Sequence, residues 1–368
     1  MNYDIRKNTG EPAYLQLYRF LIRDIVSGIY PYGTKLPSKR VIAEETGVSV
    51  ITVEHALTLL CEEGYTEARQ RSGLIVTYKG EDFLTTGEPE EKGSAGKSDQ
   101  LYATGEFPLS ILTRTMRRVM LDYGEKILVK SPNHGSYELR NELRLYLARS
   151  RGINVTPAQI IVGSGAEYLY GLIVQLLGTD RIYGLEKPSY KRIAEVYTAM
   201  GAVCHYLPLS KNGISTAQLE ETKAGILHVT PFNSYPSGVT ADISKKLEYL
   251  RWAKKRSAIL IEDNYDSELT VSRKLETPLF SMDPKANVIY INTFSRTIAP
   301  SVRIGYMILP ETMTDLFNKK LGFYSCTVPI FDQYVLAELL RSGDFERHIN
   351  RMRRKKRKLL DPRSAGPG

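Results

Sequence analysis

The chain has 368 residues, of which 42% are hydrophobic and 25% are charged, and its formal net charge is +9. This length favours two domains, and the composition is that of a globular protein rather than a fibrous or disordered one. We expect no membrane span and no signal peptide, because neither a long apolar run nor a leader pattern is present. Three widely spaced cysteines favour a reducing cytoplasm over a disulfide framework or a metal site.

The positive charge is concentrated towards the C-terminus. Residues 1–79 carry 10 basic and 9 acidic side chains, whereas residues 341–363 carry 10 and 3. The basic run 351–358 fits either a solvated helix face or contact with phosphates or a membrane surface. A prediction of DNA binding must therefore rest on motifs and not on the overall charge.

Residues 80–100 are rich in Gly, Glu, Ser and Thr and nearly free of apolar side chains, which predicts a linker. It separates a predicted domain at 12–79 from a second at 101–360. In the second domain, helical patterns alternate with short β-rich runs at 160–162, 226–229, 259–261 and 288–291. This alternation predicts an α/β fold with a mostly parallel sheet that is buried on both faces.

The first domain begins with three predicted helices. Apolar spacing predicts a helix from Tyr14 to Ser27, and Ser38 and Gly47 are suited to begin and end a second. A third helix follows Ser49 and ends at Gly64. Two helices joined by a glycine turn are typical of a helix-turn-helix, and residues 65–77 then predict a β-hairpin wing.

These motifs resemble the GntR-type winged helix, notably in Leu36-Pro37-Ser38-x-Arg40 and Gly47-Val48-Ser49-x-x-Thr52-Val53. The resemblance implies contacts to double-stranded DNA from the two helix starts and the wing. The residues assigned to DNA are Ser38, Lys39, Arg40, Ser49, Thr52, His55, Arg69, Arg71 and Gly73. Val50 and Glu54 stand where that family commonly has basic residues, so weak DNA affinity is expected. A winged helix used only for packing or protein contact is the alternative.

Several segments of the second domain resemble fold-type I pyridoxal-phosphate enzymes. A strand enters a helix through Ser164, Gly165 and Ala166, which suits phosphate binding at a helix N-terminus. The resemblance further assigns the ring-stacking position to Tyr190, the pyridine nitrogen to Asp263, the phenolic oxygen to Tyr265, and the phosphate to Ser295 and Arg303. Pyridoxal 5′-phosphate is therefore the implied cofactor.

Arg296, which is also assigned to the cofactor site, stands where that family has its cofactor lysine, directly after Ser295. A Schiff base needs a neutral primary amine, and a guanidinium remains protonated up to a pKa above about 12. We therefore expect no covalent Schiff base and no aminotransferase activity. The resemblance also leads us to expect that residues 101–360 lack most of the C-terminal small domain that such enzymes carry.

The combination of the two halves resembles the MocR group of bacterial regulators. It implies a cytoplasmic, dimeric transcription regulator whose second domain senses pyridoxal phosphate or an amino compound without catalysis. Two alternatives remain open: an aminotransferase with a relocated lysine, and a cofactor-free dimerising DNA-binding protein. The operator, the sign of regulation and the effector do not follow from the sequence.

Overall fold

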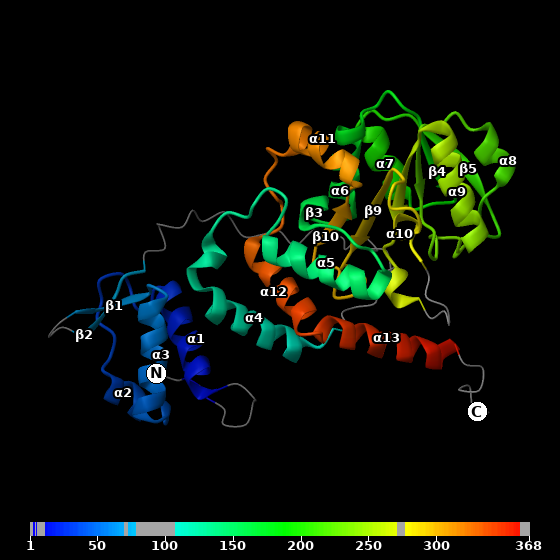
Figure 1. Ribbon diagram of the computed structural model, residues 1–368. Coiled ribbons are helices and arrows are strands. Elements are labelled where there is room, and N and C mark those ends of the chain that lie inside the picture. The colour runs from blue at the N-terminus through cyan, green and yellow to red at the C-terminus, as the bar shows by residue number, and fades with distance from the viewer. Residues whose placement is uncertain are drawn as a thin grey trace. The chain divides into compact units, whose positions relative to one another are not determined.

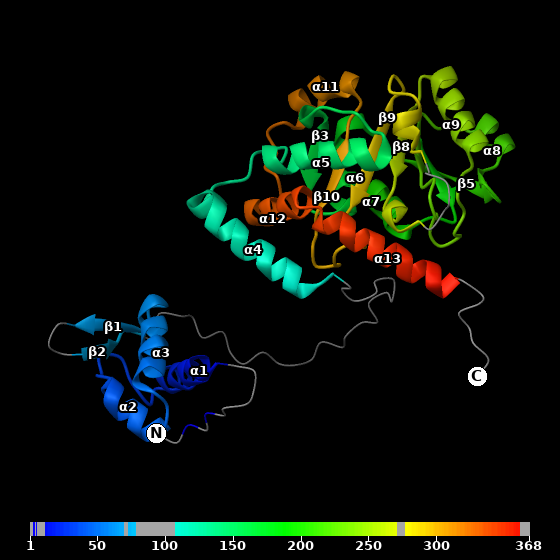
Figure 2. The ribbon, with the colours of Figure 1, turned by 60° about the horizontal axis from the view of Figure 1, so that its bottom comes forward.

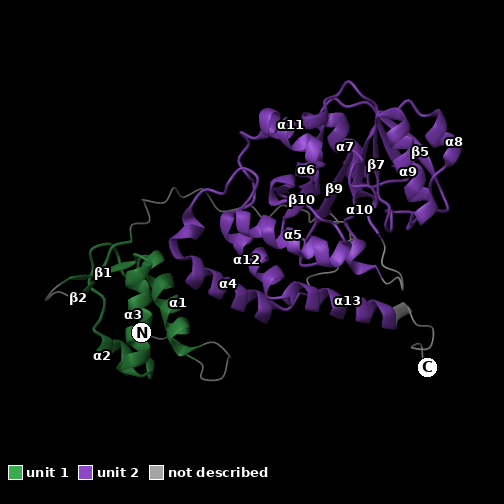
Figure 3. Cartoon of the chain, in the orientation of Figure 1, with its two compact units in different colours: residues 1–96 green, residues 97–368 purple. Residues whose placement is uncertain are grey.

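A computed structural model describes residues 3, 5, 12–69, 73–78, 107–270 and 277–360 of the chain (Figure 1). The chain forms two compact units, residues 1–96 and 97–368 (Figure 3). The predicted linker 80–100 lies outside the described residues.

The first unit contains three helices and a two-stranded antiparallel hairpin. Its elements are α1 (Ala13–Val26), α2 (Lys39–Thr46), α3 (Val50–Glu62), β1 (Thr66–Arg69) and β2 (Gly73–Val76). Buried Leu21, Ile42, Val53 and Leu60 belong to one core shared by the helices. Three helices with a small wing confirm the predicted winged helix-turn-helix.

Short-range chemistry determines where α2 and α3 begin. The Ser38 hydroxyl accepts a hydrogen bond from the Val41 N–H, and the Ser49 hydroxyl accepts one from the Thr52 N–H. Both are N-cap interactions, which satisfy a backbone donor that has no partner inside the helix. Gly47, at φ +67°, ends α2 in the left-handed conformation that glycine adopts without strain.

The second unit is built on an eight-stranded sheet of order β3-β10-β9-β8-β7-β4-β5-β6. The strands are β3 (Ile160–Gly163), β4 (Tyr183–Lys187), β5 (Cys204–Ser210), β6 (Gly213–Ile214), β7 (Ile226–Val229), β8 (Ile259–Asp263), β9 (Val288–Thr293) and β10 (Gly305–Ile308). Neighbours from β9 to β5 are parallel, whereas β10 and β6 run antiparallel to their neighbours. The prediction of a mostly parallel sheet is confirmed.

Helices cover both faces of this sheet (Figures 1 and 2). The helical elements are α4 (Leu109–Tyr123), η2 (Gly124–Leu128), α5 (Tyr137–Arg151), η3 (Pro157–Gln159), α6 (Ala166–Leu177), α7 (Lys191–Ala199), α8 (Thr216–Glu221), α9 (Ile243–Arg256), η4 (Ser267–Leu269), α10 (Leu279–Met282), α11 (Glu311–Leu321), α12 (Ile330–Arg341) and α13 (Asp344–Leu360). Alternate residues of β3 point to opposite faces: Ile160 and Val162 join a core with α5 and α12, and Ile161 joins one with α6, α7 and α11.

Helix α13 contacts the two segments that follow the carboxyl ends of β8 and β9. The Arg353 Nε donates to the Glu268 carbonyl oxygen at 2.6 Å, and the Lys356 Nζ donates to the Leu269 carbonyl oxygen at 3.2 Å. The His348 Nε2 lies 2.9 Å from the carbonyl oxygen of Thr297. Part of the basic run thus has a packing role in the second unit. No described helix is long and apolar enough to cross a membrane.

Candidate functional site

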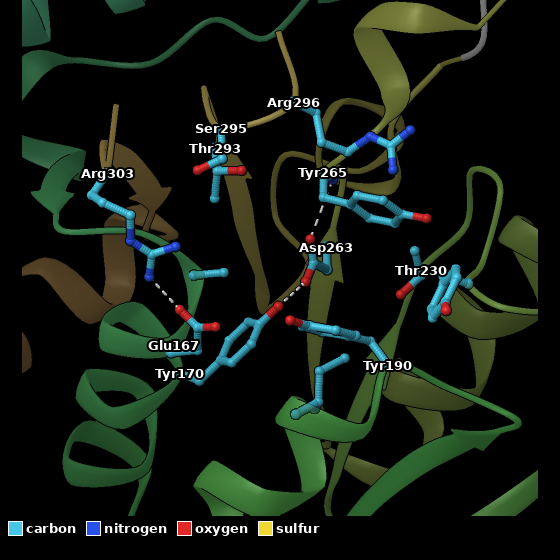
Figure 4. A pocket seen from close by; sticks show the side chains of 13 residues that line it. Glu167, Tyr170, Tyr190, Thr230, Asp263, Tyr265, Thr293, Ser295, Arg296 and Arg303 are labelled. Carbon is cyan, nitrogen blue, oxygen red and sulfur yellow. Dashed lines mark hydrogen bonds and ion pairs between the residues drawn. The ribbon is translucent and has the colours of Figure 1, made fainter. Parts of the chain in front are cut away.

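A pocket opens at the carboxyl ends of β7, β8 and β9 and at the start of α6, where open α/β sheets bind ligands (Figure 4). Its lining combines aromatic, hydroxyl and charged side chains. The lining residues are Ala166, Glu167, Tyr170, Tyr190, Ile193, Thr230, Tyr235, Asp263, Tyr265, Thr293, Ser295, Arg296 and Arg303.

At one end of the pocket, Arg303 lies beside the N-terminus of α6. Its Nη2 is 2.5 Å from the Oε2 of Glu167, in the first turn of that helix, and both side chains are partly exposed. A Cβ added to Gly165 would approach the Arg303 Nη2 to 3.0 Å, so the glycine allows this close approach. Ala166 begins the helix and Ser295 also lines the pocket. A helix N-terminus, a hydroxyl and a guanidinium together suit an anion such as phosphate.

Ser164 is turned away from this pocket. Its hydroxyl is 2.9 Å from the Thr327 Oγ1, and its N–H donates to the same oxygen at 3.2 Å. The side chain lines a neighbouring groove together with Thr327. The structure therefore does not bring the Ser164 side chain to the predicted phosphate position, because Thr327 holds it on the other side of the turn.

Asp263, at the end of β8, is buried in the middle of the pocket wall. The Tyr170 hydroxyl donates to its Oδ2, and the Tyr265 N–H donates to its Oδ1 at 3.3 Å (Figure 4). The His228 Nε2 lies 3.6 Å from the Oδ2, and its Nδ1 is 2.7 Å from the Tyr197 hydroxyl. Burial, followed by the nearby Asp263 charge, raises the pKa of Tyr170 well above its usual value. The Tyr170 hydroxyl therefore stays protonated and remains a hydrogen-bond donor to Asp263.

Two tyrosines frame the space beside Asp263. Tyr190, the residue before α7, places its ring 6.3 Å from that of Tyr235 at 74°. The Tyr265 hydroxyl donates to the Asn233 carbonyl oxygen at 2.9 Å, which fixes the loop after β7 against the loop after β8. Burial first, and then the Asp266 charge, raise the pKa of Tyr265, whereas Arg296 lowers it.

Arg296 occupies the other end of the pocket. Its Nε lies 3.0 Å from the Oδ1 of Asp266, which is 2% exposed at its side chain, and its Cζ lies 5.6 Å from the centre of the Tyr265 ring. The Asn233 Nδ2 donates to the other Asp266 oxygen at 2.6 Å. Arg296 is thus held by a carboxylate and an aromatic face.

Glu186 lies behind the loop that carries Asn233. The Ser234 hydroxyl donates to its Oε2 at 2.7 Å. Burial raises the pKa of Glu186 to about 8, despite the opposing effect of that hydrogen bond and of one from the Thr230 backbone. The carboxyl group is therefore largely protonated at neutral pH.

The structure brings most of the residues assigned to the cofactor together around one pocket. Every residue assigned to the cofactor lines the pocket except Ser164 and Gly165. The residues that the sequence analysis missed are Glu167, Tyr170, Ile193, Thr230, Tyr235 and Thr293. Glu167 and Tyr170 lie within about one helical turn of Ala166, so helical periodicity could have indicated them.

The predicted DNA-contact residues of the first unit lie at helix starts and in the wing. Ser38, Lys39, Arg40, Ser49 and His55 are exposed, and Thr52 is half-buried. The Lys39 Nζ lies 3.0 Å from the Glu54 Oε1, so α2 and α3 are joined by an ion pair between exposed side chains.

In the wing, the exposed Arg69 pairs with Glu67 on the same strand at 3.3 Å. Gly73 has φ +91°, and a Cβ there would meet the Lys35 side chain at 2.9 Å. The predicted contact at Arg71 lies outside the described residues.

Two family models match the chain. The one described as "Bacterial regulatory proteins, gntR family" matches residues 13–76, and "Aminotransferase class I and II" matches residues 99–361. The chain is also 32% identical to the uncharacterized HTH-type transcriptional regulator YdeL of Bacillus subtilis, over 95% of this chain and 78% of that protein. The chain belongs to the GntR/MocR type of HTH transcriptional regulators.

Two further relatives of this type have descriptive names. The probable rhizopine catabolism regulatory protein MocR of Rhizobium meliloti is 27% identical over 95% of this chain and 76% of that protein. The HTH-type pyridoxine biosynthesis transcriptional regulator PdxR of Corynebacterium glutamicum is 29% identical over 95% of this chain and 78% of that protein.

Solved aminotransferases share the fold of the second unit. The kynurenine aminotransferase of Pyrococcus horikoshii is 27% identical with a TM-score of 0.63, covering 68% of this chain and 65% of that chain. The α-aminoadipate aminotransferase LysN of Thermus thermophilus is 24% identical with a TM-score of 0.60, covering 67% of this chain and 64% of that chain. The regulator thus spans less than two thirds of the length of these enzymes.

Proposed function

We propose that the aminotransferase-like unit of this regulator binds pyridoxal phosphate non-covalently and acts as a sensor without catalysis. The observation that carries the proposal is the pocket, in which an anion-binding end and a buried carboxylate occur together with an arginine at 296. A sensor needs only a difference in ligand affinity between two conformations, and turnover is not required.

The lining residues fit the chemical groups of this cofactor. The start of α6, Ser295 and Arg303 would hold the phosphate, and Asp263 would accept a hydrogen bond from the ring nitrogen. Tyr190 offers an aromatic face. In enzymes the bound cofactor supplies an electron sink, and a carboxylate at the ring nitrogen strengthens it.

Arg296 argues against covalent capture. In the fold-type I pattern its position belongs to the Schiff-base lysine, and a protonated guanidinium is no such nucleophile. None of the described residues that line the pocket is a lysine. The aminotransferase alternative, with a relocated lysine, therefore has no amine among these residues.

The relatives support a small-molecule effector. The name of PdxR links that protein to pyridoxine biosynthesis, and the name of MocR links that one to rhizopine catabolism. We extend from them the expectation of a vitamin B6 phosphate, and of an amino compound, as ligands of this chain.

We further propose that the regulator binds DNA as a homodimer. Large apolar side chains are exposed on α4, just after η2 and between α11 and α12, including Leu121 at 78%, Val129 at 63% and Phe323 at 72%. Pairing with a second copy would cover exposed apolar side chains of this kind. Light scattering on the purified chain measures the oligomeric state.

In the DNA complex, the start of α3 would enter the major groove. Ser49, Thr52 and His55 would face the DNA from α3, and Ser38, Lys39 and Arg40 from the start of α2. Arg69, Arg71 and Gly73 of the wing complete the proposed surface.

Pyridoxal phosphate titrated into wild type and Arg296→Lys tests the sensor proposal. Equilibrium dialysis measures binding, and borohydride reduction followed by mass spectrometry detects an imine to a lysine. We expect wild type to bind without a reducible label and Arg296→Lys to be labelled at position 296.

The other outcomes overturn the proposal in different ways. A label on a wild-type lysine, or transfer of an amino group by the purified protein, would indicate an enzyme. Binding to neither variant would favour the cofactor-free dimerising protein.

A further inference from the structure

We propose that the pocket takes a pyridoxyl phosphate group joined to an α-amino acid, and that Arg296 binds the carboxylate of the amino acid. This inference rests on the proposed function and specifies the chemical class of its ligand. Arg296 thereby becomes a specificity-determining residue.

The pocket has a guanidinium at each of two ends. Arg303 lies beside Glu167 at the start of α6, and Arg296 lies beyond Asp263, over Tyr265 (Figure 4). A ligand with a single phosphate would use only one of these ends. Two positive groups on opposite sides of a buried carboxylate suit a ligand with an anion at each end.

Arg296 is pre-oriented. Its Nε pairs with Asp266 at 3.0 Å, and Asp266 is held in turn by the Asn233 amide at 2.6 Å. The Tyr265 ring, 5.6 Å from the Arg296 Cζ, supports one face of the guanidinium. These contacts use the Nε, and no hydrogen bond of the two Nη groups is found within the described part of the chain. The Nη groups are thus available at the pocket wall.

A carboxylate is the ligand group that this arrangement suits best. The planar fork of an arginine donates two parallel hydrogen bonds to a carboxylate, and a fixed fork loses little entropy on binding. Asp266 faces the Nε side of Arg296, so its negative charge offsets only part of the positive charge on the Nη side. A ligand ammonium would be repelled by the guanidinium. Thr230 and Tyr235, also in the lining, leave hydroxyl and aromatic surface for the rest of the amino acid.

Two ligands that differ only in the carboxylate test the inference. The first is N-(5′-phosphopyridoxyl)glycine, and the second is N-methylpyridoxamine 5′-phosphate. Neither has an aldehyde, so no lysine can capture them. Calorimetry on the full chain measures both affinities. We expect wild type to prefer the glycine ligand about 10-fold to 100-fold, as for a hydrogen-bonded charged group, and Arg296→Gln to bind both almost equally.

The matched control is Arg303→Gln, which should weaken both ligands by one common factor and keep the preference. Arg296→Lys provides a second variant, because it retains the charge without the fork and should keep a smaller preference than wild type. Equal affinities in wild type, or an unchanged preference in Arg296→Gln and Arg296→Lys, would overturn the inference. Failure of the proposed function is distinguishable, since wild type would then bind neither ligand nor pyridoxal phosphate.

Discussion

The two ends of the pocket hold their arginines in different ways. The side chains of Arg303 and Glu167 are 53% and 35% exposed, whereas those of Arg296 and Asp266 are 26% and 2% exposed. A solvated ion pair stabilises a protein by about 0–1 kcal/mol, but removing one member of a buried pair costs about 3–5 kcal/mol. The Arg303 pair is therefore easily exchanged for a ligand phosphate, and the Arg296 pair is a fixed part of the wall.

The largest expected effect is on stability. Arg296→Met leaves the Asp266 carboxylate buried without its cation, and we expect it to lower the free energy of unfolding by about 3 kcal/mol. Arg303→Met leaves Glu167 unpaired but partly exposed, and it should change the free energy of unfolding by less than about 1 kcal/mol. Trp252 is the single tryptophan and lies in the second unit, so its fluorescence during urea unfolding reports this unit alone. If both variants lost the same free energy of unfolding, the two arginine pairs would not differ in their contribution to stability.

The next effect is the pH dependence of stability that Glu186, near the Arg296 end, is expected to cause. Its folded-state pKa of about 8 lies above the ordinary 4.5, so the folded state holds a proton that the unfolded state releases. The resulting stabilisation is fully present below pH 4.5 and is lost as the pH rises to about 8.

Glu186→Gln cannot ionise and should lose this dependence. Between pH 5 and 8, its stability relative to wild type should rise by on the order of 3 kcal/mol. Urea midpoints at several pH values measure the difference. Parallel pH profiles for the two proteins would show that Glu186 is ionised in the folded state.

A smaller effect is expected at the Arg303 end. Glu167→Gln removes the carboxylate that competes with a ligand phosphate for Arg303, and it should tighten pyridoxal phosphate binding about 5-fold, equivalent to about 1 kcal/mol. Equilibrium dialysis measures the affinity. Weaker binding by this variant would mean that Glu167 supports Arg303 rather than competing for it.

The smallest effect extends the comparison to the first unit. The exposed Lys39–Glu54 pair is similar in kind to Arg303–Glu167. Glu54→Gln should release Lys39 towards a DNA phosphate and strengthen non-specific DNA binding about 2-fold to 3-fold, with a steeper salt dependence. Fluorescence anisotropy with duplex DNA at several salt concentrations tests this, with Glu62→Gln on the C-terminal turn of α3 as the control.

Local chemistry made much of the fold predictable. Ser38 and Ser49 determine where α2 and α3 begin, and Gly47 determines where α2 ends, because capping needs only neighbouring backbone groups. Likewise, the short apolar stretches within β7 and β8 indicated strands of a sheet that is covered on both faces.

Contacts between distant segments could not be predicted in this way. The direction of Arg296 depends on Asp266, 30 positions earlier, and the direction of Ser164 depends on Thr327. Glu54 was expected to repel phosphate, and its pairing with Lys39 became visible only when α2 and α3 were packed. Sequence position assigned residues to the pocket, but tertiary packing decides which atoms face the ligand.

The contacts of α13 have a consequence for communication within the second unit. One of its side chains, His348, contacts the carbonyl of Thr297, next to Arg296, and another, Arg353, contacts the carbonyl of Glu268, two residues after Asp266. A single rigid helix thus spans the backbones on both sides of the Arg296–Asp266 pair. A ligand contact that changed the spacing of Arg296 and Asp266 would therefore act on two backbone segments that α13 holds together.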